Sequence, residues 1–319
     1  MEVLVFDIGG TKIRAGIFDT TSAALIRSAV AATPNHLHFR EESFGELSAR
    51  LLSEMHRLAN EIVDCQSVRQ ISVAFAGPID PSGGVLAAPT IWGPPPARPY
   101  ALGKEMALRW PNARIKVMND VTAAGYRYCR PQDDDFCIVT VSSGIGNKVF
   151  SRGRPLVGRN GRGGEIGYLR VDDSKTAPLC ECGGRGHLGA ISSGRGALET
   201  ARRHAPDGAS ADALTSGDLA AAFRRKECWA VAVIAQGAGP LGWALAAMHL
   251  GLGIERFVLV GGFALALGDA YRQLVAEAAG ARSWGSPGAW ESRVELGEND
   301  DWSGLIGAGI AEMRRSEPL

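Results

Sequence analysis

Two cysteines and a histidine lie close together in the segment CECGGRGHLG, residues 180–189. Cys180, Cys182 and His187 have a spacing that zinc sites use, because thiolate sulfur and imidazole nitrogen are ligands that Zn²⁺ prefers. A structural zinc site needs a fourth ligand, which this segment does not identify. Two interpretations therefore stay open from these residues: a zinc site, or a glycine-rich loop that contains two inert thiols.

A carboxylate, two glycines and a hydroxyl follow one another in DIGGTK, close to the first residue. Backbone N–H groups in such a turn can form an anion-binding concavity, and the carboxylate could lie near a hydrated Mg²⁺. The spacing is not that of a Walker A loop, G-x-x-x-x-G-K-[ST], and a plain hairpin turn is the alternative. The candidate phosphate-binding residues here are Asp7, Gly9, Gly10, Thr11 and Lys12.

A second turn of the same kind occurs in SSGIG, residues 142–146, where Ser143, Gly144 and Gly146 are the candidates. Two phosphate-binding turns that face each other across a cleft would suit a triphosphate. Gly261 and Gly262 follow a third apolar segment. Because glycine has no side chain, this pair would permit close approach by a nucleotide base or ribose.

Asn119 and Asp120 come directly after an apolar segment and before a predicted helix. A carboxylate at that junction could accept the proton of a hydroxyl nucleophile, while the neighbouring amide hydrogen-bonds another hydroxyl. The alternative is structural, because Asn and Asp are also the preferred residues at helix N-caps.

The elements that must position these residues follow from hydrophobic periodicity. The spacing predicts a hairpin over residues 3–19, a long amphipathic helix over 42–64, strands at Gln70–Phe75, Ile115–Met118 and Arg256–Val260, and a short helix around Tyr100–Arg109. Residues 78–99 are rich in Pro and Gly and predict a loop. Residues 190–252 are expected to be mostly helical, and another helix is expected over Gly304–Arg314.

The strand–turn–strand pattern of residues 3–19 returns at 136–153. This internal repeat indicates a duplicated α/β fold with two α/β domains around a cleft. We place the N-terminal domain at residues 1–118 and the C-terminal domain at 119–303, with the last helix packing back on the first domain.

Composition excludes several function classes. The 319 residues carry 34 basic and 34 acidic side chains, and this neutral balance argues against a nucleic-acid partner. We find no apolar run of the roughly 18 residues that a membrane span needs, and the first residues lack a signal-peptide pattern. We expect a cytoplasmic protein whose six cysteines are free thiols or metal ligands.

Taken in order, the motifs resemble those of the ROK family (repressors, uncharacterised reading frames and sugar kinases). The resemblance covers nearly the whole chain, through DIGGTK, AFAGPID, MNDVTAAGY, SSGIG, GRNGRGGEIGYLRV, CECGGRGHLG, VLVGGF and GLIGAG. It implies the actin/hexokinase-like (ribonuclease H-like) fold and transfer of a phosphoryl group from ATP, with Mg²⁺, to a sugar hydroxyl. We also expect a small polyol substrate and a homodimer.

The resemblance also implies roles for individual residues. Asp120 corresponds to the general base, Asn119 and Glu165 correspond to sugar ligands, and Tyr168 occupies another position of the sugar site. The two glycine turns correspond to the phosphate end, and the segment with Cys180 corresponds to the family's zinc loop.

The chain departs from the family pattern at the recognition end. The family's EIGH histidine, which both ligates zinc and touches the sugar, is Tyr168 here; a zinc-loop cysteine is His187, and a glutamate is Gly189. Asn147 and Lys148 stand where the family has further glycines, and the sequence offers no interpretation of them. Because groups that would bond a hexose are missing, we infer an acceptor with a hexose-like hydroxymethyl end and a different far end, such as a C7-cyclitol of the valiolone type.

Three other functions are weighed against this one. A sugar-responsive repressor of the family carries a DNA-binding segment before its first motif, which here begins at Asp7. A non-catalytic sugar sensor would not need Asp120 and both glycine turns. A glucose, fructose or amino-sugar kinase that tolerates Tyr168 and Gly189 would be separated from a cyclitol kinase by its substrates.

Overall fold

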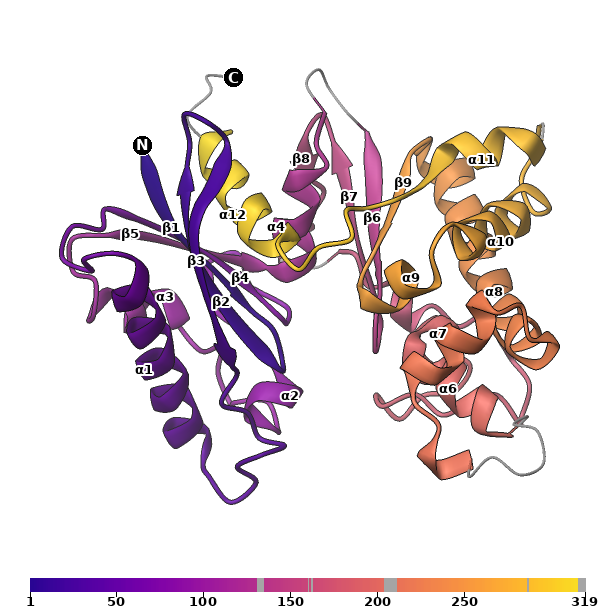
Figure 1. Ribbon diagram of the computed structural model, residues 1–319, viewed down its shortest axis with the longest axis horizontal. Coiled ribbons are helices and arrows are strands. Elements are labelled where there is room, and N and C mark those ends of the chain that lie inside the picture. The colour runs from indigo at the N-terminus through magenta and orange to yellow at the C-terminus, as the bar shows by residue number, and fades with distance from the viewer. Residues whose placement is uncertain (131–134, 160, 162, 204–210, 286, 315–319) are drawn as a thin grey trace. The chain divides into compact units, whose positions relative to one another are not determined.

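The computed structural model describes residues 1–130, 135–159, 161, 163–203, 211–285 and 287–314. Contacts divide the chain into two units, each with its own sheet and core (Figure 1). Unit 1 comprises Met1–Cys129, Val157–Gly163 and Asp300–Leu319, and unit 2 comprises Arg130–Leu156 and Gly164–Asn299. The first boundary therefore lies at Cys129 and not near Met118, because the helix after Asp120 packs within unit 1.

Unit 1 is built on a five-stranded sheet with the order β3-β2-β1-β4-β5. Strands β1, β2 and β3 pair antiparallel, whereas β4 and β5 continue the sheet parallel to β1. Since β4 and β5 are parallel to β1, their carboxyl ends reach the edge of the sheet where β1 turns into β2. The bounds are β1 Glu2–Ile8, β2 Lys12–Asp19, β3 Ala24–Ala32, β4 Gln70–Phe75 and β5 Arg114–Asn119.

Side chains alternate in direction along β1, so the two faces of this sheet pack against different helices (Figure 1). Leu4 and Phe6 belong to the core under α1, whereas Val3 and Val5 belong to the core under α12. The helix α1 (Phe44–Ile62) begins with a capping box between Ser43 and Glu46. The other helices are α2 (Pro89–Trp92), α3 (Leu102–Ala107), α4 (Asp120–Arg127) and α12 (Ser303–Met313).

Unit 2 repeats the sheet of unit 1, with the order β10-β9-β6-β7-β8. Strands β6, β7 and β8 form the antiparallel part, and β9 and β10 add parallel strands beside β6. This repetition confirms the duplicated α/β fold. The bounds are β6 Phe136–Val141, β7 Ile145–Ser151, β8 Arg154–Pro155, β9 Phe257–Val260 and β10 Val294–Leu296.

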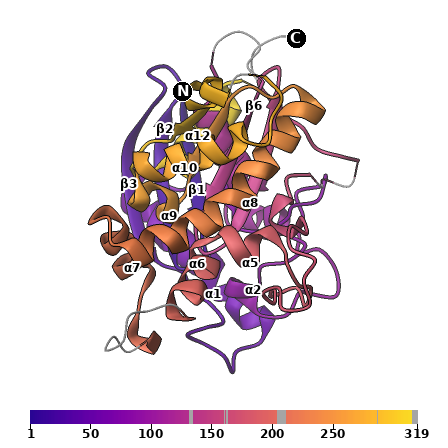
Figure 2. The ribbon, with the colours of Figure 1, turned by 90° about the vertical axis from the view of Figure 1, so that its right-hand side faces the viewer.

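Helices of unit 2 enclose a second core, in which α8 packs along α10 (Figure 2). Short 3₁₀ turns η1 (Ile166–Tyr168), η2 (Ala211–Ala213) and η3 (Pro287–Ala289) connect the elements. The helices are α5 (Leu188–Ser192), α6 (Gly194–Arg203), α7 (Ser216–Arg224), α8 (Cys228–Leu252), α9 (Gly262–Leu267), α10 (Asp269–Gly280) and α11 (Trp290–Arg293).

The helix α8 corrects one expectation from the sequence. It is long and apolar enough to cross a membrane by length and composition, although no such apolar run was expected. Half of its most apolar window is buried inside the protein. Ala230, Val233, Ile234 and Leu241 on this helix belong to the core of unit 2, so packing explains its apolar character.

Most predicted elements of unit 1 are present with small changes of their ends. The strand β4 has the predicted bounds, and α1 begins and ends two residues inside the predicted 42–64. The segment 78–99, expected to be a loop, contains the short helix α2. The strands β3, β8 and β10, which lie at sheet edges, were not predicted from the sequence.

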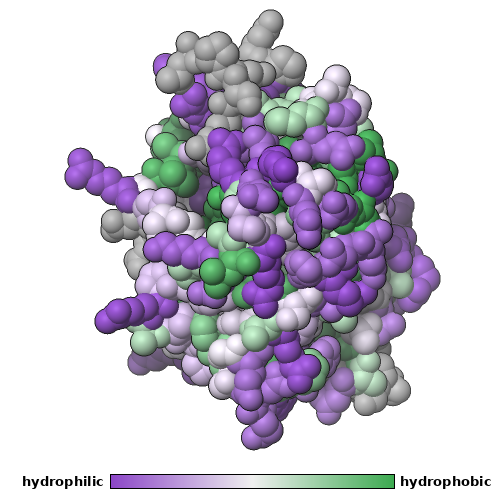
Figure 3. Space-filling model, turned by 90° about the vertical axis from the view of Figure 1, so that its left-hand side faces the viewer, coloured by the Kyte–Doolittle hydropathy of each residue, from purple (hydrophilic) through white to green (hydrophobic). Residues whose placement is uncertain are grey.

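Figure 3 shows one side of the molecule, where small apolar groups are scattered among hydrophilic side chains.

Candidate active site

The junction of β5 and α4 places Asn119 and Asp120 side by side in unit 1. Asn119 is the N-cap, and its Oδ1 accepts a hydrogen bond from the Thr122 N–H at 3.1 Å. The Asn119 side-chain amide donates to the Gly77 carbonyl at 3.1 Å and to Asp120 Oδ1 at 2.8 Å. Asp120 is therefore the first helical residue and not the cap, so its carboxylate is not needed for the capping bond of the helix.

The Asp120 carboxylate lies in an environment that favours its protonated form. Desolvation by burial raises its pKa to about 7, and the nearby charge of Asp7 contributes in the same direction. Hydrogen bonds from the Val121 N–H, at 2.9 Å, and from Asn119 oppose this shift. A carboxylate with a pKa near neutrality suits a general base, because it can accept a proton and release it again at the operating pH.

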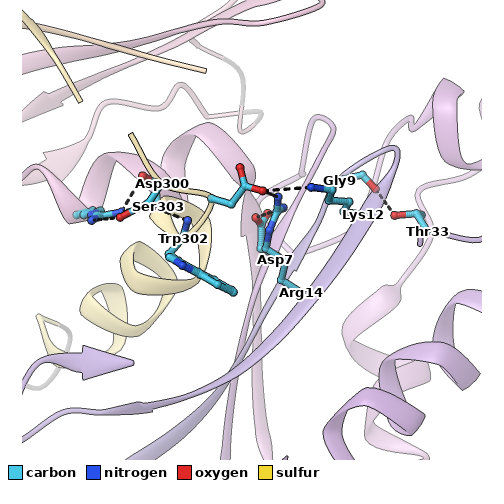
Figure 4. A network of polar contacts seen from close by, with 10 residues as sticks. Asp7, Gly9, Lys12, Arg14, Thr33, Asp300, Trp302 and Ser303 are labelled. Atoms are coloured by element: carbon cyan, nitrogen blue, oxygen red, sulfur yellow. Dashed lines mark hydrogen bonds and ion pairs between the residues drawn. The ribbon is translucent and has the colours of Figure 1, made fainter. Parts of the chain in front are cut away.

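Asp7, at the end of β1, is the second carboxylate of this group. Burial raises its pKa to about 6, while the Arg14 guanidinium lowers it and Asp301 raises it. Arg14 Nη1 lies 3.2 Å from Asp7 Oδ2, and Arg14 Nη2 lies 2.9 Å from Asp301 Oδ2. Lys12 Nζ also contacts Asp301 Oδ2, at 3.3 Å (Figure 4). Arg14 and Asp301 were not predicted from the sequence, since they are 287 positions apart along the chain.

Glycine at position 304 is required by the carboxylate of Asp7. A Cβ atom on Gly304, in the first turn of α12, would lie 2.6 Å from Asp7 Cγ. The start of α12 is fixed from α4, because Arg127 contacts both Asp300 at 2.6 Å and Ser303 Oγ at 3.1 Å (Figure 4). The end of the chain therefore contributes directly to the surroundings of Asp7.

The glycine turn between β1 and β2 is held by two buried polar residues that the sequence analysis missed. Thr33 Oγ1 donates to the Gly9 carbonyl at 2.7 Å, and Asn35 Nδ2 donates to the Gly10 carbonyl at 2.9 Å. The Thr33 N–H donates to the Thr11 carbonyl at 3.0 Å. Both Thr33 and Asn35 are 1% exposed. With three carbonyls fixed in this way, the turn is preorganised, and its exposed residue Thr11 can donate to an anion.

The second glycine turn lies in unit 2, between β6 and β7. The Ser142 N–H donates to the Gly144 carbonyl at 3.0 Å, and the Gly194 N–H donates to the Ser142 carbonyl at 2.7 Å. A Cβ on Gly144 would meet no atom of the described residues within 4 Å. Ser143 is exposed, and Gly146 already belongs to β7, opposite Thr140.

Gly261 and Gly262 join β9 to α9 in the same unit. Gly261 has a φ of +96°, and a Cβ there would lie 2.7 Å from the Val141 carbonyl oxygen at the end of β6. At Gly262, which begins α9, a Cβ would meet no described atom within 4 Å. Unit 2 thus brings both of its glycine motifs to the carboxyl ends of β6 and β9.

The segment with Glu165 and Tyr168 lies beside β7. Both side chains are exposed, and the exposed fraction of Tyr168 is 57%. A Cβ on Gly167 would lie 2.4 Å from the Ile145 carbonyl oxygen, and one on Gly189 would lie 3.1 Å from the Gly167 carbonyl oxygen. A side chain at position 189 would therefore require the Gly167 carbonyl, in the 3₁₀ turn η1, to give by a few tenths of an ångström.

Cys180, Cys182 and His187 meet in space as the spacing predicted. One ligand atom from each lies within 4.8 Å of the other two, and Cys182 Sγ is 3.2 Å from His187 Nδ1. Two sulfurs and an imidazole nitrogen within this distance fit three corners of a tetrahedral zinc site. The Tyr168 ring packs edge-on against the His187 ring, with the centroids 6.0 Å apart.

The predicted site residues thus form two groups, each within one unit. Unit 1 brings together Asp120, Asn119, Asp7 and the turn Gly9–Lys12. Unit 2 holds the turn Ser142–Gly146, the pair Gly261–Gly262, the segment Glu165–Tyr168 and the zinc-type cluster.

Comparison with known proteins covers almost the entire chain. Residues 3–312 match the sequence profile of the ROK family. A C(7)-cyclitol 7-kinase of Streptomyces hygroscopicus subsp. jinggangensis (strain 5008) is 36% identical, over 99% of this chain and 95% of the relative. The C(7)-cyclitol 7-kinase of S. hygroscopicus subsp. limoneus is 37% identical, with the same coverage of both chains.

A solved structure gives the same result for the fold. A ROK family glucokinase from Streptomyces griseus, in complex with glucose and AMPPNP, superposes with a TM-score of 0.76 at 25% sequence identity. The superposition covers 98% of this chain and 99% of the glucokinase.

Proposed function

The chain belongs to the ROK family, and from this premise we propose that it is an ATP-dependent kinase that phosphorylates the hydroxymethyl group of a C7-cyclitol. Similarity over nearly the whole length to two C(7)-cyclitol 7-kinases supports the acceptor class. The observation that carries the chemistry is Asp120, a partly buried carboxylate with a raised pKa beside Asp7 and next to an amide side chain that fixes it.

In this proposal Asp120 accepts the proton of the acceptor hydroxyl as that oxygen attacks the γ-phosphorus of ATP. The bond between this phosphorus and the β–γ bridging oxygen breaks, and ADP leaves. The Asn119 hydrogen bond holds Asp120 Oδ1 in place. The Asn119 side chain itself is fixed by Gly77 and Thr122. A preorganised base of this kind costs no rearrangement when the proton moves, and general-base assistance is typically worth about 10²- to 10⁴-fold in rate.

Each unit carries one glycine turn that we propose as a phosphate ligand of ATP. In unit 1 the turn Gly9–Lys12 offers exposed donors on a backbone fixed by Thr33 and Asn35. In unit 2 Ser143 and Gly144 lie in the equivalent turn between β6 and β7. The role of positioning is large in this reaction class, because phosphoryl transfer depends mainly on alignment and charge stabilisation.

Mg²⁺ fits the carboxylate of Asp7. A hard cation prefers carboxylate and water oxygens, and burial has raised the Asp7 pKa, so a nearby cation would favour the ionised form. When bound with ATP, the ion neutralises charge on the phosphates. Asp7, at the end of β1, is the residue that would hold it.

Zinc fits the loop of residues 180–187, where Cys180, Cys182 and His187 would be three of its ligands. The ligand set departs from that of the family. Such an ion would fix the loop that precedes α5, and the Tyr168 ring lies against its histidine.

A panel of acceptors tests the proposed function. Valiolone-type cyclitols, glucose, fructose and N-acetylmannosamine would be compared by ATP-dependent phosphorylation and by kcat/KM. We expect a cyclitol to have the highest kcat/KM and glucose to be a poor acceptor, because each buried hydroxyl without a partner costs about 1–3 kcal/mol. A higher kcat/KM for glucose or an N-acetylated amino sugar would make the chain a hexose or amino-sugar kinase. Absence of phosphorylation with every acceptor would favour a sensor.

A further inference from the structure

Lys148, whose role the sequence motifs did not explain, is buried in the sheet of unit 2. Lys148 is 5% exposed and Asn147 is 4% exposed, both on β7. Lysine is almost never fully buried unless its charge is paired, because an ammonium without a partner is costly to remove from water. We therefore expect a negatively charged group near the Lys148 ammonium.

The backbone on both sides of Glu165 is attached to β7 at this point. The Asn147 N–H donates to the Gly164 carbonyl at 3.3 Å, and the Ile166 N–H donates to Asn147 Oδ1 at 3.2 Å. Gly164 has a φ of +91°, and a Cβ there would lie 3.2 Å from Lys148 Nζ. The ammonium group therefore lies next to the residue that precedes Glu165.

Two acidic groups act on the Lys148 ammonium. Burial lowers the Lys148 pKa, whereas the charge of Glu165 raises it most and that of Cys137 raises it less. Burial raises the pKa of the Cys137 thiol to about 12, so this thiol is neutral at physiological pH. Glu165 is then a negative charge that favours the ionised form of Lys148, and the ammonium lies beside Gly164, the residue that precedes Glu165.

We propose that Lys148 is a positioning residue for Glu165: its ammonium, fixed in the sheet, holds the Glu165 carboxylate in the orientation that binds the hydroxyls of a neutral polyol acceptor. The inference rests on the proposed function, in which Glu165 is an acceptor ligand. The Glu165 side chain is exposed, and a charge fixed in the sheet would narrow the set of rotamers that it populates. Asn147 fixes the backbone on both sides of Glu165. In this proposal Asn147 and Lys148 therefore both position Glu165.

The experiment compares K148M, E165Q and the double variant K148M/E165Q. K148M keeps an unbranched side chain of similar length but removes the charge. We expect K148M to raise KM for the acceptor about tenfold, which corresponds to about 1.4 kcal/mol, with little change in kcat or in KM for ATP. The double variant should have the same KM as E165Q alone, because the two residues act as one unit.

The matched control is K175M, since Lys175 is an exposed lysine of the same unit. It should leave both KM values and the melting temperature unchanged. Thermal unfolding of the same variants provides a readout that does not need catalysis: K148M and E165Q should show non-additive shifts, because E165Q removes a negative charge that acts on the buried ammonium.

Additive effects of K148M and E165Q on acceptor KM would overturn the inference, as would equal increases in KM for acceptor and ATP. Its failure is distinguishable from failure of the proposed function. If the wild type prefers glucose to cyclitols, the substrate proposal fails, and the same variants are measured with glucose. If no acceptor is phosphorylated, the proposed function fails, and additive thermal shifts would then overturn the pairing by themselves.

Discussion

At the scale of single residues, Asp120 is available for chemistry because Asn119 caps the helix. Of the two interpretations of this dipeptide, the capping role belongs to the Asn119 side chain. The role of general base is the one proposed for Asp120. The Asn119 amide also donates to Asp120 Oδ1 at 2.8 Å, so the capping residue orients the proposed base.

Replacement of Asp120 by Asn tests the proposed base. We expect D120N to lose about 10²- to 10⁴-fold in kcat, the usual worth of general-base assistance. The variant should fold, with an equal or higher melting temperature, because an amide replaces a carboxylate whose ionised form is disfavoured by burial. Kinetics and thermal unfolding measure both quantities. Near-wild-type turnover would contradict the assignment of Asp120.

The raised pKa values predict opposite pH trends for activity and stability. The free-enzyme profile of kcat/KM should rise with pH through about 7, as Asp120 becomes ionised. Stability should fall across pH 4–7, because folded Asp120 retains a proton that the unfolded chain, with a pKa of about 4, has already released. Asp7, with a pKa of about 6, acts in the same direction.

Denaturant unfolding at a series of pH values measures the second trend, and D120N is its control. The variant lacks one of the two groups, so its free energy of unfolding should depend less on pH than that of the wild type. An unchanged pH dependence would mean that Asp120 has an ordinary pKa in the folded protein.

At the scale of elements, the loop of residues 180–187 brings two thiols and an imidazole to one point before α5 begins. Backbone bonds form the turn: the Cys180 N–H donates to the Gly184 carbonyl at 2.7 Å, and the Gly183 N–H donates to the Cys180 carbonyl at 2.9 Å. These backbone bonds hold the loop, which would lower the ordering cost of binding an ion.

Replacement of Cys182 tests the proposed zinc site. We expect protein purified without chelator to contain at most one zinc per chain, and C182S to contain less, because one of three ligands is removed. Elemental analysis measures the content. The control is C228S, which removes an exposed cysteine outside the cluster. Equal zinc in both variants would place the ion elsewhere, and no zinc in the wild type would mean that backbone bonds and packing alone hold the loop.

At the scale of the whole molecule, unit 1 is assembled from segments far apart in sequence. The helix α12, near the end of the chain, packs on β1, and its Leu305 and Ala308 share a core with Val3 and Val5. Glu312 on the same helix is 3% exposed and contacts Arg114 at 2.9 Å and Lys116 at 3.8 Å on β5. The two ends of the chain therefore stabilise the same sheet.

Removal of the Glu312 carboxylate should destabilise unit 1. We expect E312A to lower the free energy of unfolding by about 1–3 kcal/mol, because it removes a buried charge-assisted hydrogen bond and leaves two cations together. Chemical denaturation measures the change. The control is E41A, since Glu41 is an exposed carboxylate of the same unit. Equal stability of the two variants would show that the Glu312 contacts contribute nothing.

The sequence by itself determined what depends on local order. Hydrophobic periodicity gave α1 and β4, the repeated strand–turn–strand pattern gave the duplication, and ordered motifs gave the family. The roles of Asp120 and Glu165 stay predictions, although in the folded protein the charge of Asp7 acts on Asp120 and the charge of Glu165 acts on Lys148.

The tertiary structure decided what depends on neighbours distant in sequence. Edge strands such as β3 and β8 are defined by pairing, which a single segment does not encode. Arg14 meets Asp301, Thr33 fixes the Gly9 carbonyl, and Lys148 is buried beside Glu165 only because the chain folds back on itself. Burial and the charges of distant residues set pKa values and side-chain orientation, and both arise only when the fold removes these groups from water.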